Sequence, residues 1–247
     1  MTQVATRRRK KPSVGQRMMG GFGEILITLG IVLLLFVAWE LWWTNIDANK
    51  AQQQVTTQFA QGLEIGVGND DETDFGPAPV ARIPEDETFG IFYIPRFGKD
   101  FAHPVTNGVG MDVLNAVGIG HYPETQAPGE LGNFAVAAHR QTHGQVFWDI
   151  DKFETGDKIY LQTKEGFYTY EWRNTEIVEP SQGEVLLPVP HEPGTEPTTS
   201  ILTMTSCHPP FTTRLRIIAY SELTSWRPAE AGAPTAIADL VAKTMKN

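Results

Sequence analysis

The chain has a single cysteine, Cys207, so it cannot form an intrachain disulfide. Basic residues are concentrated at the N-terminus, where residues 1–20 hold six of the 20 Lys and Arg residues and no acidic residue, and they are sparse in the rest of the chain. The net charge is nevertheless -9, so the globular part is acidic and poorly suited to nucleic acid. The sequence also has no internal repeats. These absences argue against a disulfide scaffold, a nucleic-acid-binding domain and a repeat protein.

One apolar segment is long enough to cross a membrane. Residues 25–39 carry no charge, and the segment reaches roughly 20 residues when it is extended to Phe22 and Trp43, about the length that the hydrocarbon core requires. Three tryptophans gather at its C-terminal end, where indoles favour the interface. No small-x-small cleavage site follows, which favours an uncleaved anchor over a signal peptide. We therefore expect a basic cytoplasmic N-terminus over residues 1–20, an anchor over residues 21–43 and an extracytoplasmic remainder.

Residues 44–87 are predicted to be an extracytoplasmic linker or stalk. The polar segment at residues 45–61, with Gln52-Gln53-Gln54 in its middle, is compatible with a helical stalk. Asn69–Asp74 and Pro77–Pro79 have the composition of a disordered acidic linker.

A β domain is predicted over residues 88–223, followed by a tail at residues 224–247 with a weak amphipathic helix. A short helix is expected at residues 111–117. Strand signals occupy residues 90–95, 133–140, 158–163, 167–173 with a continuation at 176–178, 199–206 and 215–223. Short strands at regular spacing with few helices predict a closed or nearly closed β-barrel.

Three chemically suited residues stand at the ends of predicted strands. Cys207 follows one apolar run, His139 follows another, and Arg216 begins a third. A cysteine thiolate attacks carbonyl carbon, an imidazole moves the proton, and a guanidinium stabilises the oxyanion. Because strand ends of a barrel meet at one rim, these side chains can converge. They are what a thiol transpeptidase needs.

Each of these residues has an alternative reading. A lone cysteine at a strand end is often a buried small hydrophobe. Arg214 is a second candidate for the guanidinium, and His208 for the base, although strand neighbours point to opposite faces. His139 and His143 have a spacing that binds zinc on a helix, but a strand leads into this segment. We predict neither a metal nor a cofactor.

Several motifs resemble the sortase family, the membrane-anchored cysteine transpeptidases of Gram-positive bacteria. Thr203-Met204-Thr205-Ser206-Cys207 resembles the family signature Thr-Leu-x-Thr-Cys, with methionine for leucine and serine for threonine. Ala137-Ala138-His139-Arg140 resembles the segment that holds the family histidine, and Arg216 precedes an apolar strand as the family arginine does. Residues 118–144 look most like class E sortases of actinobacteria. The resemblance covers about residues 88–223.

The resemblance implies an eight-stranded sortase-type β-barrel, mainly β with short helices. It implies cleavage of a secreted protein's C-terminal sorting signal between threonine and glycine, a thioester on Cys207, and transfer to an amino group of a lipid-linked peptidoglycan precursor. Class E members are associated with LAxTG rather than LPxTG signals, and His121 and Tyr122 would then lie near the substrate groove. Thr205 and Ser206, whose hydroxyls flank the cysteine, are further candidate substrate-binding residues, but alternation turns only one of them toward the groove.

Three other functions remain open from the sequence. A hydrolase with the same triad would release proteins instead of attaching them. A pilin-polymerising sortase would use a lysine of another protein as its nucleophile. A non-catalytic extracytoplasmic binding domain would keep the fold without the reaction.

Overall fold

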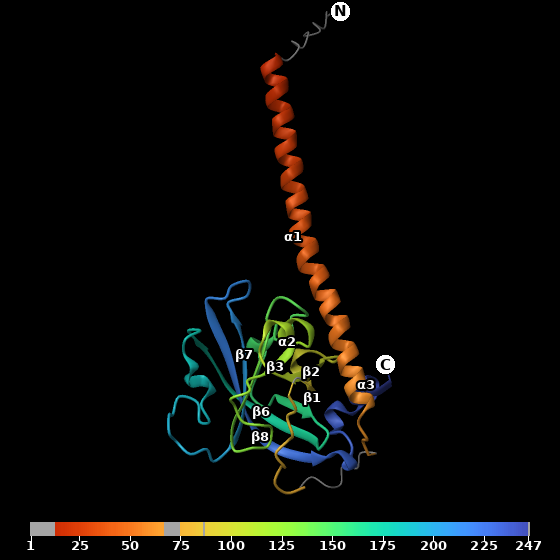
Figure 1. Ribbon diagram of the computed structural model, residues 1–247, viewed down its shortest axis with the longest axis vertical. Helices are drawn as coiled ribbons and strands as arrows, with labels where there is room; N and C mark the ends of the chain where they lie inside the picture. Colours follow the sequence, from red (N-terminus) through yellow and green to blue (C-terminus); the bar gives the residue numbers. More distant parts are fainter. Residues whose placement is uncertain (1–12, 67–74, 86, 247) are drawn as a thin grey trace, which may run out of the picture. The chain divides into compact units, whose positions relative to one another are not determined.

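The computed structural model describes residues 13–66, 75–85 and 87–246, and the chain divides into two units, Met1–Trp43 and Thr44–Asn247. The helix α1, Val14–Gln61, runs through the first unit and continues into the second (Figure 1). The Ser13 hydroxyl accepts from the Gln16 N–H at 3.3 Å and the Gln16 side chain accepts from the Ser13 N–H at 3.0 Å, which caps its start. The apolar part of α1 is long and apolar enough to cross a membrane.

The second unit is built on a closed barrel of eight strands (Figure 1). The strands are β1 Thr88–Tyr93, β2 Ala102–Asn107, β3 Ile119–His121, β4 Gly132–Ala138, β5 Lys158–Gln162, β6 Gly166–Val178, β7 Ser200–His208 and β8 Leu215–Pro228. Their order around the barrel is β1-β2-β3-β4-β7-β8-β6-β5. The pairs β2–β3 and β4–β7 are parallel and the other pairs are antiparallel. The predicted eight-stranded, mainly β fold is confirmed.

Short helical turns connect and cover the strands. They are η1 Pro95–Phe97, α2 Met111–Ala116, η2 Ile150–Lys152, η3 Gly183–Leu186, η4 Ala229–Ala231, η5 Thr235–Ile237 and α3 Ala238–Lys246. The C-terminal part of α1 and α3 lie side by side against the outside of the barrel (Figure 1), where Ala60 and Val241 pack with Tyr93. The weak amphipathic helix of the tail is therefore a packed element, because its apolar side covers the barrel.

Every second residue of the central strands points into the barrel, and these apolar side chains fill its interior. Phe134 and Val136 of β4, Leu202 and Met204 of β7, and Ala219 of β8 belong to one buried cluster. The residues between them therefore face outward from the sheet. This alternation decides which candidate site residues share a face.

Two strands of the barrel were not predicted. β2 contains Pro104, and proline within an apolar run argues against a strand because it donates no hydrogen bond to the ladder. β3 has only three residues, including Gly120, so it carries no alternation signal. β8 also extends to Pro228, beyond the expected end of the domain at residue 223.

The prediction of a disordered linker is wrong for Pro77–Pro79. The Tyr168 hydroxyl donates to the Pro79 carbonyl at 3.0 Å, and Ala81 is 3% exposed, with its N–H donating to the Pro128 carbonyl. Ala78 also packs against the buried core cluster, so this segment lies on the barrel. The acidic stretch Asn69–Asp74 lies outside the described residues.

Candidate active site

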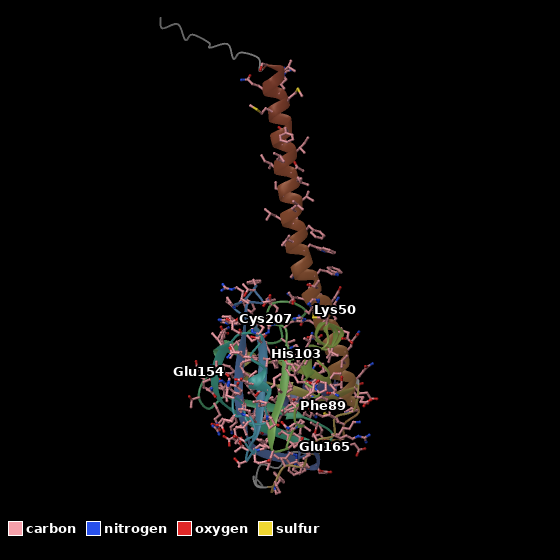
Figure 2. All side chains as sticks on the ribbon, turned by 60° about the vertical axis from the view of Figure 1, so that its left-hand side comes forward. Lys50, Phe89, His103, Glu154, Glu165 and Cys207 are labelled. Carbon is pink, nitrogen blue, oxygen red and sulfur yellow. The ribbon has the colours of Figure 1, made fainter. Side chains whose placement is uncertain are left out.

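Cys207 stands near the C-terminal end of β7, with its side chain on the outer face of the sheet. Leu202 and Met204 point into the barrel core, so alternation turns Thr203, Thr205 and Cys207 outward. Figure 2 shows Cys207 near one end of the barrel and Glu165, in the β5–β6 turn, near the opposite end. The cysteine is half-buried, so its thiol is reachable and partly shielded from water.

Arg216 is the direct cross-strand partner of Cys207 in the antiparallel pair β7–β8. Directly opposed residues project from the same face, with Cβ atoms about 4.5–5.5 Å apart. The Arg216 Nη1 donates to the carbonyls of Thr213 and Leu215, each at 3.0 Å. Arg214 is exposed in the loop before β8 and pairs with no residue of β7. The geometry therefore places Arg216, and not Arg214, beside the cysteine.

His139 follows the last residue of β4, on the other side of β7. The parallel register pairs Ala137 with Thr205, and the same offset of 68 residues would bring His139 level with Cys207. The ends of β4 and β7 remain adjacent beyond that pair, because the Ser206 hydroxyl donates to the Ala138 carbonyl at 2.8 Å. Since Ala138 points into the core, His139 points outward. His139, Cys207 and Arg216 thus form one row across three neighbouring strands.

A buried arginine, Arg140, links the segment after β4 to the end of β7. The Arg140 side chain is 1% exposed and forms an ion pair with Asp151 at 2.7 Å. Its Nη1 donates to His208 Nδ1 at 2.8 Å. Burial and the Arg140 charge lower the pKa of His208, which keeps this ring neutral as an acceptor. His208 is therefore engaged on the side of the sheet opposite to Cys207, which weakens it as an alternative base.

The His139 imidazole has two close neighbours. Its Nε2 donates to Asn115 Oδ1 at 2.8 Å, from the short helix α2. The ring of His143 lies over it, with ring centroids 5.1 Å apart. Burial lowers the pKa of His139 below its usual value of 6.5, and the proximity of His143 lowers it further. The imidazole is therefore neutral at pH 7 and can accept a proton. Asn115 was not predicted as a site residue, since a lone Asn in a short helix carries no recognisable pattern.

Of the four predicted substrate-binding residues, two share the face of the cysteine. The Tyr122 hydroxyl lies 3.1 Å from the Thr205 hydroxyl, so both side chains meet on the outer face next to Cys207. Ser206 is 4% exposed and bonds to the Ala138 carbonyl, behind that face. His121 is 2% exposed and packs against Phe134, with its Nδ1 at 2.9 Å from Asn107 Oδ1. His121 and Ser206 are thus not brought to the face that holds the thiol.

The outer face continues along β7 and β8 under the β6–β7 connection. Asn133 Nδ2 donates to the carbonyls of Val185 and Leu187, each at 3.0 Å, and so fastens this connection over the sheet. A cleft of about 330 Å³ lies between the connection and the strands, with Ile201 and Tyr220 among its lining residues. Tyr220 is four residues from Arg216 along β8, roughly 13 Å away in an extended strand.

Comparison with known proteins identifies the family of the chain. The family model described as "Sortase domain" matches residues 92–224. Sortase SrtE1 of Streptomyces coelicolor is 32% identical over 247 residues, covering 96% of this chain and 67% of that protein. SrtA sortase from Actinomyces oris superposes with a TM-score of 0.63 at 34% identity, over 67% of this chain and 96% of that chain. Sortase E1 from Streptomyces coelicolor, solved with a tripeptide in the active site, gives a TM-score of 0.57 at 33% identity, over 64% and 99%.

The chain therefore belongs to the sortase family, whose members are cysteine transpeptidases. Within the family it groups with the class E sortases of actinobacteria. The resemblance drawn from the sequence is confirmed at both levels.

Proposed function

We propose that this chain is a membrane-anchored sortase that cleaves a C-terminal sorting signal between threonine and glycine and transfers the protein to an amino group of a lipid-linked cell-wall precursor. The row formed by His139, Cys207 and Arg216 is the observation that supports this most strongly. A peptide substrate is further supported by the tripeptide in the active site of the Streptomyces coelicolor sortase E1. The class E grouping favours an LAxTG-like signal over LPxTG.

The first half-reaction forms the thioester. Because Asn115 occupies Nε2 of His139, Nδ1 is the nitrogen left to take the thiol proton. The Cys207 sulfur bonds to the threonine carbonyl carbon, and the Arg216 guanidinium donates to the oxyanion. As the intermediate collapses, the carbon–nitrogen bond to glycine breaks and the His139 imidazolium gives its proton to the departing amine.

The second half-reaction releases the enzyme. The amino group of the acceptor attacks the thioester carbon, and the neutral His139 takes the proton that this amine loses. Arg216 stabilises the second oxyanion in the same way. The carbon–sulfur bond then breaks, the new amide is formed, and the Cys207 thiolate takes the proton back from the His139 imidazolium.

The outer face of the barrel offers a track for the signal peptide. Thr205 and Tyr122 would contact the residues next to the cleaved bond. An extended peptide covers roughly 3.3 Å per residue, so four residues would reach from Cys207 to the cleft beside Tyr220. His121 and Ser206 would support this track from behind and would not touch the peptide.

The apolar part of α1 would hold the enzyme where both substrates are found. The basic residues before it favour a cytoplasmic N-terminus, which would put the barrel outside the cell membrane. A translocating protein and a lipid-linked precursor would both be presented at that outer surface.

Mass spectrometry of the full chain in detergent tests the proposal. Incubation with an LAxTG peptide should add the acyl mass to Cys207, and an added amine should convert this thioester to a new amide. An LPxTG peptide measures signal preference. Omission of the amine separates a transpeptidase from a hydrolase, and a lysine side chain as the preferred acceptor would indicate pilin polymerisation. Absence of any acyl-enzyme with either peptide would refute the proposal.

Replacement of Asn115 should impair catalysis without preventing binding. Asn115→Ala removes the acceptor that fixes the His139 ring, so we expect kcat to fall about 10- to 100-fold, as misplaced catalytic groups do, with KM within about twofold. Asn115→Asp retains an acceptor and should recover most of kcat. Its carboxylate favours the imidazolium, so it should also move the acid limb of the pH profile upward. Met111→Ala, an exposed change on the same helix, serves as control. A wild-type kcat for Asn115→Ala would contradict the orienting role.

The acid limb of kcat/KM should lie below pH 6.5. The pKa of His139 is lowered, first by burial and second by His143, so the neutral imidazole persists to lower pH than in a free histidine. Activity falls as the pH drops through this pKa, because the imidazolium cannot accept the thiol proton. His143→Gln removes the side chain whose electrostatic effect lowers the pKa of His139, so the limb should move to higher pH. His191→Gln, on the β6–β7 connection, should leave it in place. A limb that moved down, or did not move, in His143→Gln would exclude this coupling.

A further inference from the structure

The C-terminal part of α1, residues 44–61, is docked on the barrel and is here called the stalk segment. Its buried positions, Ala48, Gln52, Thr56 and Ala60, are 6%, 1%, 3% and 0% exposed. A spacing of four residues places them on one helix face. Gln53 and Gln54, next to Gln52, are exposed. A polar side chain as large as glutamine is rarely this buried without a specific partner.

Two polar side chains of the stalk segment bond to the loop that begins at His139. Gln52 Nε2 donates to the His143 carbonyl at 3.0 Å, and Asn45 Oδ1 accepts from the Gly144 N–H at 2.9 Å. We call residues 139–147 the histidine loop. Figure 2 shows Lys50 of the stalk segment near the same end of the barrel as Cys207. Two side chains of the stalk segment thus hold two consecutive backbone groups of this loop.

The histidine loop has a conformation that needs external support. His143, Gly144 and Gln145 have φ angles of 49°, 92° and 54°, all in the left-handed region. Such residues are costly outside glycine and persist where the surroundings fix them. A Cβ at Gly144 would lie 2.8 Å from Gln52 Oε1 and 2.9 Å from Asn49 Oδ1, so the helix approaches as closely as glycine allows. The stalk segment therefore supplies external contacts that help to fix this loop.

The contact leads directly to the catalytic imidazole. Gln52 bonds to the backbone carbonyl of His143, and the ring of His143 lies over the ring of His139. The loop closes on itself where the Phe147 N–H donates to the His139 carbonyl at 3.0 Å. Gln52 also meets the turn after α2, since a Cβ at Gly118 would lie 3.0 Å from Gln52 Cδ. Gln52 thus lies between the loop that carries His139 and the helix that carries Asn115.

From this geometry we infer that Gln52 is a positioning residue, through which the stalk segment holds the histidine loop and sets the place of the His139 imidazole. The inference rests on the proposed function, because it assigns the catalytic proton transfer to His139. The stalk segment is then part of the catalytic apparatus, in addition to being a connection to the membrane anchor.

The test compares two glutamines that lie two positions apart in the sequence, in the full chain in detergent. Gln52→Met keeps the size of the side chain and removes its N–H donors, and Gln54→Met makes the same change on the exposed face. We expect Gln52→Met to lower kcat about tenfold with KM within about twofold, as displacement of a catalytic group does. Its acid limb should also shift, because the separation of His139 and His143 changes. Amides of residues 143–147 should exchange hydrogen faster in Gln52→Met and not in Gln54→Met.

A second variant and the hydrogen-exchange measurement ensure that every outcome decides the question. If Gln52→Met melts at a much lower temperature than the wild type, Asn45→Ala replaces it, since this half-buried residue holds Gly144 from outside the buried stripe. A variant with wild-type kcat and wild-type exchange at residues 143–147 would overturn this inference and leave the proposed function intact. Loss of kcat with unchanged exchange in the loop would also overturn it. A wild-type chain that forms no acyl-enzyme would instead overturn the proposed function, and this inference with it.

Discussion

Replacement of Cys207 by alanine should abolish the acyl-enzyme and all transfer. Without the sulfur no covalent bond to the threonine carbonyl can form, so we expect kcat to fall by about 10⁴-fold or more, as it does when other nucleophiles are removed. The fold should survive, because loss of one half-buried thiol costs at most about 1 kcal/mol. Intact-mass spectrometry with an LAxTG peptide measures the first effect, and thermal unfolding the second.

The neighbouring serine provides a matched control. Ser206 points behind the face that holds Cys207 and donates to the Ala138 carbonyl. Ser206→Ala should therefore cost about 1 kcal/mol of unfolding free energy through the lost hydrogen bond, while thioester formation continues. A Cys207→Ala chain that still cleaves the sorting signal would place the nucleophile elsewhere and end the assignment. Loss of the thioester in Ser206→Ala, with unfolding unchanged, would assign the hydroxyl a chemical role that its orientation does not support.

The row of His139, Cys207 and Arg216 could be predicted because each member has a sequence signal. Cys207, His139 and Arg216 all adjoin apolar runs, and alternation along β7 correctly separates Thr205 from Ser206. Closure of the barrel then brings the ends of β4 and β7 and the start of β8 to one rim, independently of the conformation of the loops between them. The choice between Arg214 and Arg216 needed the β7–β8 register, which the sequence does not contain.

The residues that hold the row in place could not be predicted in the same way. Gln52 and His143 are 91 positions apart, and Asn115 and His139 are 24 apart, with no motif in either segment. The resemblance to class E sortases implied that His121 lies near the substrate groove. The register of β3 against β4 instead turns it toward the core beside Phe134. Positions fixed by tertiary contact leave little trace in local pattern.

Arg216→Lys should reduce catalysis nearly as much as removal of the side chain. The guanidinium is oriented by Nη1, which donates to the Thr213 and Leu215 carbonyls, so its other donors have a fixed direction. Lysine keeps the charge but offers a flexible point donor in place of the planar fork. We expect kcat to fall about 10²- to 10³-fold, or about 3–4 kcal/mol of transition-state stabilisation, as when one oxyanion donor is removed. Steady-state kinetics with an LAxTG peptide and an amine measure it.

Arg214→Lys is the matched control, because Arg214 is exposed and lies only two residues before Arg216. Its kcat should stay within about twofold of the wild type. The division between kcat and KM tells which contact is lost: an interaction made only in the transition state lowers kcat, whereas uniform peptide binding raises KM alone. A KM effect without a kcat effect in Arg216→Lys would make Arg216 a peptide-binding residue. Near-normal activity of Arg216→Lys together with a collapse in Arg214→Lys would move the oxyanion role to Arg214, and the cross-strand pairing with Cys207 would then have no chemical purpose.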